Sequence, residues 1–247
     1  MAGLDWLTAR PVAHRGLHDA ASGVVENTPS AVRAAMAADY AIEVDLQISA
    51  DGEAMVHHDR ALGRLTEGDG PIARHNAAQL QQIRFHNSRD RMMTLGDLLD
   101  LVSGRVTLLL ELKSAFDDDL RLAARVADVA QSYRGPVAAM SFDPAPIAAI
   151  KDRAPKLTRG LVAERYDRAR HDRQGAGAGD KLAFAARIAG SWPHFLAYSV
   201  RDLASPIPLV ARHVLRMPLL AWTVRREDEG RRAERFADQI IFEGFRP

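Results

Sequence analysis

The sequence predicts an α/β fold, a single TIM-type (β/α)8 barrel. Short β-rich runs alternate with amphipathic helical stretches along the whole chain, a pattern typical of a parallel sheet built from βα units. The chain has 247 residues, 47% of them apolar, which is enough for a substantial core. The Gly-rich stretch 174–179 is too short for an interdomain linker and predicts a surface loop. We therefore expect one domain over residues 1–247.

Nine runs have the composition of strands, one more than a barrel of eight requires. They are residues 11–15, 41–47, 54–58, 106–113, 137–142, 157–163, 195–200, 218–224 and 238–243. Only a short turn containing Asp51-Gly52 separates the second run from the third, whereas a parallel crossover needs about a dozen residues. These two runs are predicted to form a hairpin, with one of them outside the regular parallel set.

Helix starts are marked by a capping side chain followed by proline at the first helical position. Three dipeptides have this form: Thr28-Pro29, Asp143-Pro144 and Ser205-Pro206. Thr94 and Asp97 form a capping-box pattern with an aspartate in place of the usual glutamate, opening a helix that Gly104 can close.

Composition excludes several classes of partner and chemistry. The formal net charge is +1, from 33 basic and 32 acidic residues, which predicts no nucleic-acid binding and no broad attraction to anionic membranes. The absence of cysteine excludes disulfides, thiolate metal sites and a cysteine nucleophile. No apolar run approaches the roughly 18 residues needed to span a bilayer, and the N-terminus lacks a signal-peptide pattern. We expect a soluble, cytoplasmic protein, whose oligomeric state the sequence leaves open.

Four short motifs carry the candidate chemistry, each at or near the end of a predicted strand: His14-Arg15-Gly16, Glu43-x-Asp45, His58-Asp59 and Glu111-x-Lys113. Active sites of (β/α)8 barrels gather at the C-terminal ends of the strands, so residues distant in the chain become neighbours there. Carboxylates suit a hard divalent cation, imidazoles transfer protons near neutral pH, and Arg and Lys bind phosphate oxygens. The set predicts metal-assisted attack on a phosphodiester.

Strand alternation places Glu43 and Asp45 on one face, where two acids repel each other unless a cation or shared proton compensates them. A metal ion is the simplest compensation, and a solvated strand face is the alternative. The same alternation pairs Glu111 with Lys113, as a third metal ligand and a phosphate-binding cation. The alternative there is a structural ion pair inside the barrel.

His58 of the third motif and the preceding His57 point to opposite sides of a predicted strand, so only one can face the pocket. We prefer His58 to His57 because Asp59 can orient its ring, and because it would complement His14. A lone histidine at a strand end is otherwise more often structural. Glu26 precedes the first proline-marked helix and is placed beside the pocket, or is simply an acid favoured by the helix dipole.

Trp222 lies near the end of a predicted strand and either walls the pocket or packs inside the barrel. The remaining histidines show no spacing that suggests a site and are interpreted as surface or structural residues: His18, His75, His86, His171, His194 and His213.

Taken together, these motifs resemble the glycerophosphodiester phosphodiesterase family, part of the larger group of phosphatidylinositol-phospholipase-C-like phosphodiesterases. The resemblance extends along nearly the whole chain. It includes His14-Arg15-Gly16, Glu26-Asn27-Thr28, Glu43-Val44-Asp45-Leu46, Asp51-Gly52, His58-Asp59 with Leu62 and Arg64, Thr94-Leu95, Glu111-Leu112-Lys113, Ser141-Phe142 and Trp222-Thr223-Val224.

The resemblance implies a TIM barrel that hydrolyses a small-molecule glycerophosphodiester to glycerol 3-phosphate and an alcohol. It implies a divalent ion, Mg²⁺ or Ca²⁺, on Glu43, Asp45 and Glu111. In such enzymes the glycerol 2-hydroxyl attacks phosphorus, and water then opens the cyclic phosphate.

The resemblance also implies roles for the other motif residues. His14 and His58 correspond to the general acid/base pair, and Arg15 and Lys113 to the phosphate-binding cations. Glu26 would support the first motif.

One departure from the family pattern lies at the last strand, where a Thr-Asp pair is usual and this chain has Phe242-Glu243. We expect this change to reshape the pocket floor and the glycerol or alcohol subsite without touching the metal and histidine set. Two alternative functions remain: a lysophospholipase D-type phosphodiesterase, which needs an apolar channel, and a non-catalytic barrel that binds a phosphorylated metabolite.

Overall fold

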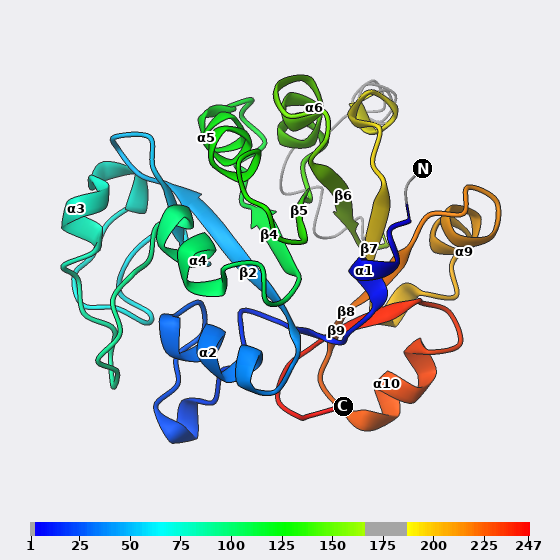
Figure 1. Cartoon of the computed structure of the whole chain (residues 1–247), viewed down its shortest axis with the longest axis horizontal. Coiled ribbons are helices and arrows are strands. Elements are labelled where there is room, and N and C mark those ends of the chain that lie inside the picture. The colour runs from blue at the N-terminus through cyan, green and yellow to red at the C-terminus, as the bar shows by residue number, and fades with distance from the viewer. Residues whose placement is uncertain (1–2, 166–186) are drawn as a thin grey trace.

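The computed structural model describes residues 3–165 and 187–247, in which the strands form a central ring with helices around it (Figure 1). The strands are β1 (Val12–Ala13), β2 (Ala41–Ile48), β3 (Ala54–Val56), β4 (Leu108–Leu112), β5 (Val137–Ser141), β6 (Thr158–Ala163), β7 (Phe195–Ser199), β8 (Leu219–Val224) and β9 (Gln239–Phe242). The helices include α1 (Asp5–Thr8), α2 (Pro29–Ala37), α3 (Ala77–Leu80), α4 (Leu95–Val102), α5 (Arg121–Ala130), α6 (Pro144–Arg153), α9 (Pro206–His213) and α10 (Glu227–Ala233), with 3-10 turns η1 (Ala20–Ser22), η2 (Ile72–Arg74) and η4 (Val200–Asp202). The predicted loop at 174–179 and His171 lie outside the described residues.

The ring is a closed parallel barrel, as predicted. Its strand order is β1-β9-β8-β7-β6-β5-β4-β2, and the pairing of β1 with β2 closes it. β3 pairs with β2 in the antiparallel direction and is not part of the ring, so the predicted hairpin and its surplus strand are confirmed. β3 ends at Val56 rather than at residue 58, and both His57 and His58 therefore follow the strand.

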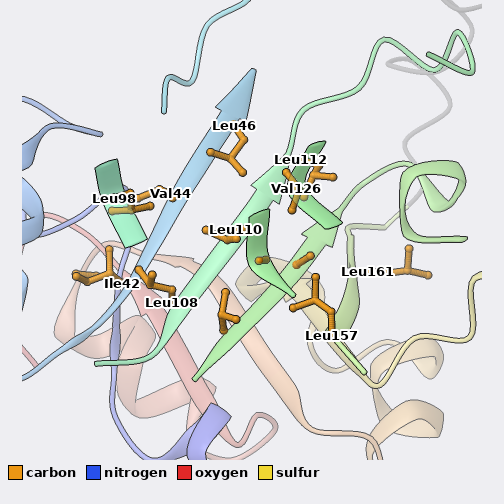
Figure 2. Packing of buried hydrophobic residues seen from close by; sticks show 14 of the residues in the cluster. Ile42, Val44, Leu46, Leu98, Leu108, Leu110, Leu112, Val126, Leu157 and Leu161 are labelled. Carbon is orange, nitrogen blue, oxygen red and sulfur yellow. The ribbon is translucent and has the colours of Figure 1, made fainter. Parts of the chain in front are cut away.

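Alternation along β2 and β4 separates an apolar outer face from an inner face that carries the acidic side chains. Ile42, Val44 and Leu46 belong to the main apolar core, as do Leu108, Leu110 and Leu112. Figure 2 shows these side chains beside Leu98 of α4 and Val126 of α5, which cover the outside of the sheet. Burying each of these side chains contributes about 1.5–3 kcal/mol, so the outer face fixes which residues point inward.

A second apolar cluster fills the inside of the barrel toward its N-terminal end. Its members include Leu109, Met140, Phe195 and Leu220 from four strands, and Leu7 from α1 joins them. α1 therefore closes the N-terminal end of the barrel, and polar side chains are left to gather at the opposite end.

The predictions of N-terminal caps are confirmed with one exception. Thr28 and Asp143 each accept a backbone N–H through their side chains at the starts of α2 and α6. Thr94 and Asp97 form both bonds of a capping box on α4. The C-cap of this helix is Ser103, with a left-handed φ of 48°, one residue before the predicted Gly104. Ser205 occupies the N-cap position of α9, but its hydroxyl makes no capping bond within the described segments.

Between β3 and α4 the chain forms an insertion, residues 57–93, that contains η2 and α3. Its apolar side chains form a separate small core with Met55: Leu62, Ile72, Leu80, Phe85 and Met92. No helix in the described part of the chain is long and apolar enough to cross a membrane.

Candidate active site

Three buried carboxylates meet at the C-terminal end of the barrel. Glu43 and Asp45 come from β2 and Glu111 from β4, and the parallel register sets Asp45 directly opposite Glu111. One oxygen from each of the three lies within 4.8 Å of the others. The predicted acidic cluster is therefore assembled by two adjacent strands, and the solvated strand face is excluded because Glu43 is only 1% exposed and Asp45 fully buried.

Two cations contact this cluster from either side. Lys113 Nζ lies 2.7 Å from Asp45 Oδ1 and 2.5 Å from Glu111 Oε1. Arg15 donates its backbone N–H to Glu43 Oε2 at 3.0 Å, and its side-chain Nε lies 3.2 Å from Asp45 Oδ2. Burial alone would lower the pKa of Lys113, but the two carboxylates outweigh it and raise that pKa.

Glu43 is the least compensated acid. Burial, followed by the charges of Asp45 and Glu111, raises its pKa well above the ordinary value. Its Oε1 is buried and has no hydrogen-bond partner among the described residues. Three converging carboxylates with an unused oxygen match the all-oxygen donor set that Mg²⁺ and Ca²⁺ prefer, so the residues present fit a divalent cation.

His14 lies on the edge of this cluster, immediately after β1. Its Nε2 is 3.9 Å from Glu43 Oε2. Gly16 closes the turn at a φ of 78°, and a Cβ at this position would lie 2.8 Å from Ala31 of α2, so only glycine allows this approach. Burial is the largest influence on His14 and lowers its pKa, while the hydrogen bond that His14 donates to Glu243 opposes the shift.

The prediction that the altered end of the last strand leaves the histidine set untouched is wrong, because Glu243 contacts His14. Glu243 Oε2 lies 2.5 Å from His14 Nδ1, although the two residues are 229 positions apart. His18, which was expected to lie apart from the site, has its Nε2 3.7 Å from the same oxygen. The departure from the family pattern thus reaches the first histidine directly.

A chain of polar contacts connects the second histidine to the first motif. His58 Nδ1 and Asp59 Oδ1 are 2.8 Å apart, and Arg64 Nε donates to Asp59 Oδ2 at 2.5 Å. Arg64 also donates to Glu26 Oε1 at 2.7 Å, and Glu26 accepts a further bond from Arg15 at 2.8 Å. Glu26 therefore bridges the two histidine-bearing segments, a role beyond that of a helix-entry acid.

The neighbouring His57 lies in a different environment. It is 1% exposed, its ring packs near Phe85 of the insertion, and neither ring nitrogen has a hydrogen-bond partner in the described chain. The two histidines thus differ although neither lies within β3, and His58 is the one joined to the polar network.

Trp222 and Phe142 lie above the inner apolar cluster. Their rings meet edge to face with centroids 5.2 Å apart, and both side chains are half-buried. Trp222 therefore packs inside the barrel and also forms part of the surface at its mouth.

Sequence reasoning assigned no role to Asn27, Arg64 or Glu243. Asn27 contacts Asp45, Arg64 contacts Asp59 and Glu26, and Glu243 contacts His14. Asn27 and Arg64 belong to motifs that match the family, so the sequence contained a sign of their importance. The only sign for Glu243 was the departure from the family pattern at residues 242–243.

Known proteins of one family are similar to this chain. The model of the glycerophosphoryl diester phosphodiesterase family matches residues 14–242. No curated protein matches the chain.

Solved structures of similar fold include a phosphodiesterase from Oleispira antarctica in complex with the product sn-glycerol-3-phosphate, with 21% identity and a TM-score of 0.77 over 96% of this chain and 94% of that one. The glycerophosphodiester phosphodiesterase from Thermotoga maritima has 20% identity and a TM-score of 0.71, over 94% of both chains. That from Agrobacterium tumefaciens has 21% identity and a TM-score of 0.68, again over 94% of both. From the family match over nearly its whole length, the chain belongs to the glycerophosphoryl diester phosphodiesterase family and is a phosphoric diester hydrolase.

Proposed function

We propose that this protein hydrolyses glycerophosphodiesters to glycerol 3-phosphate and an alcohol, with a divalent metal ion and with His14 and His58 as the acid/base pair. The observation that carries the proposal is the convergence of three buried carboxylates, two cations and His14 at one end of the barrel. The family match supports the reaction class, and the product complex of the Oleispira antarctica phosphodiesterase supports the product.

Glu43, Asp45 and Glu111 would hold the ion, with Mg²⁺ and Ca²⁺ both suited to their oxygens. A bound divalent cation would offset the negative charge that develops on the phosphoryl oxygens. Lys113 and Arg15 bind phosphate oxygens and orient the phosphodiester for in-line attack.

The two imidazoles move the protons. In the first step one imidazole takes the proton of the glycerol 2-hydroxyl as its oxygen bonds to phosphorus, while the other donates a proton to the departing alcohol oxygen as its bond to phosphorus breaks. In the second step the roles reverse: water loses a proton and attacks the cyclic phosphate, and the 2-oxygen regains a proton as it leaves. Trp222 walls the pocket beside the substrate.

The test is release of glycerol 3-phosphate from a panel of glycerophosphodiesters, including glycerophosphocholine and glycerophosphoethanolamine. Each substrate is assayed with Mg²⁺, with Ca²⁺ and with excess chelator. We expect metal-dependent release that ranks the headgroups. Glu234→Gln, an exposed change on the outer helix layer, provides a control variant that keeps full activity.

Silence across this panel would overturn the proposed substrate. Release of an alcohol from lysophospholipids in its place would identify the lysophospholipase D-type reaction. Tight binding of glycerol 3-phosphate without turnover of either substrate class would identify a non-catalytic barrel.

A further inference from the structure

The ends of β9 and β1 lie side by side and present one acid and one imidazole. Ala13 pairs with Phe242 in the parallel register, and these are the last residues of their strands. The residue that follows is His14 after β1 and Glu243 after β9. His14 N–H donates to Phe242 O at 2.9 Å, and Glu243 N–H donates to Val224 O of β8 at 3.0 Å. The backbones of both residues are therefore fixed by the barrel itself.

The contact between the two side chains determines which nitrogen of His14 is free. A carboxylate accepts hydrogen bonds, so the Nδ1 that lies 2.5 Å from Glu243 Oε2 is the protonated nitrogen. Nε2 is then left to exchange a proton. This nitrogen is the one that lies toward Glu43 and the acidic cluster, at 3.9 Å.

The second carboxylate oxygen of Glu243 accepts a hydrogen bond from Arg225. Arg225, just after β8, donates from Nε to Glu243 Oε1 at 2.6 Å, and the Arg225 backbone N–H donates to Glu229 Oε2 at 2.9 Å. The carboxylate therefore has one oxygen on the imidazole and one on a guanidinium. This bracing fixes its plane, and with it the plane of the ring.

We infer that Glu243 is a positioning residue for His14: it accepts the Nδ1–H, sets the tautomer and turns Nε2 toward the reacting atoms. The inference rests on the proposed function and adds to it a residue outside the metal and histidine set. Glu243 acts on turnover through His14, and Arg225 acts through Glu243. A carboxylate that orients a catalytic imidazole in this way typically contributes more than tenfold to turnover, because the wrong tautomer presents no base to the substrate.

The isosteric change Glu243→Gln tests this role. We expect kcat to fall about 10–100-fold while KM changes little, since the substrate-binding cations are untouched. Glu243→Asp keeps the charge but shortens the reach, and should fall between the wild type and Glu243→Gln. Glu234→Gln should match the wild type, and melting curves check that every variant is folded.

A double-mutant cycle with His14→Ala separates positioning from general support of the fold. If Glu243 acts through His14, adding Glu243→Gln to His14→Ala causes no further loss of kcat. An equal loss in both backgrounds would overturn the inference, as would an unchanged kcat in Glu243→Gln alone.

Nitrogen-15 NMR of the histidine side chains provides a readout that does not need turnover. The wild type should show His14 protonated on Nδ1, with that proton shifted downfield by the short bond to a carboxylate. Glu243→Gln should move this signal upfield. A His14 protonated on Nε2 in the wild type would sink the inference even if glycerol 3-phosphate is released, whereas absence of release with the expected tautomer would count against the proposed function alone.

Discussion

Asn27 holds Asp45 by two hydrogen bonds at once: its Oδ1 accepts from the Asp45 backbone N–H at 3.1 Å, and its Nδ2 donates to Asp45 Oδ2 at 2.8 Å. Asn27 is itself buried and adopts a left-handed φ of 58°, a conformation that asparagine tolerates better than most residues. The amide thus fixes both the main chain and the carboxylate of one acid in the cluster.

Loss of this amide should weaken metal binding. For Asn27→Gly, which keeps the backbone conformation accessible, we expect affinity for Mg²⁺ or Ca²⁺ to fall about 10–100-fold, the usual cost of removing a group that orients a metal ligand. Calorimetric titration measures this. Asn87 is exposed and has a similar φ of 57°, so Asn87→Gly is the matched control and should bind as the wild type does. Equal affinities for all three proteins would contradict the prediction.

The three histidines of the two motifs should differ sharply in their effect on turnover. His14→Ala and His58→Ala are expected to lower kcat about 10²–10⁴-fold, the usual contribution of general acid–base groups. His57→Ala removes a ring buried against the insertion core and should mainly lower stability. Comparison of kcat per folded protein across the three variants checks the assignment, and similar losses at His57 and His58 would refute it.

The acidic cluster should oppose folding when no metal is bound. Glu43 lies buried beside two other acids, so Glu43→Gln removes a like-charge repulsion on the order of 1 kcal/mol. We expect the melting temperature of the metal-free protein to rise by roughly 2–4 °C, the shift that this free energy gives in a chain of such size. The same variant should lose the stabilisation that added Mg²⁺ or Ca²⁺ gives the wild type. A drop in the metal-free melting temperature would contradict the repulsion.

Stability at acid pH should depend on Asp59. Partial burial alone would raise its pKa, but the hydrogen bonds from Arg64 and His58 outweigh burial and lower the pKa to about 2. A lowered carboxyl pKa stabilises the fold above the unfolded value of about 3.9, and this stabilisation is lost as pH falls toward 2. Urea denaturation across this interval should give a shallower loss of unfolding free energy for Asp59→Asn than for the wild type. Arg64→Met should flatten the curve in the same way, and unchanged slopes would be evidence against the pair.

The strand pattern of this fold could be predicted because parallel barrel strands are buried and bounded by strong turn signals. The Asp51-Gly52 turn identified the hairpin between β2 and β3. Strand ends were less predictable, since no glycine, proline or other turn residue separates Val56 from His57 and His58, although the backbone has already left the sheet there. The insertion core was missed because its members, from Leu62 to Met92, follow neither a helical nor a strand period.

The candidate site was predictable where its residues share a strand, as Glu43 and Asp45 do. Contacts between distant segments were not, because periodicity carries no information about partners across the barrel. The hydrogen bond from His14 to Glu243 joins segments that follow the first and last strands of the chain. The one from Arg64 to Glu26 spans 38 residues. The sequence showed the change at residues 242–243. That Glu243 lies beside His14 became evident only from the register of β1 against β9.

The separate small core of the insertion divides the protein into two parts with different tolerance for change. His58 stands at the start of the insertion, whereas all three acids of the acidic cluster belong to barrel strands. Because its apolar side chains pack on one another and on Met55, we expect the insertion to tolerate changes of length beyond Arg64 while the barrel keeps its shape. Arg64 has to be kept in any such exchange because it binds both Asp59 and Glu26, so residues 65–92 are the part of the insertion that can be replaced without rebuilding the polar network at His58.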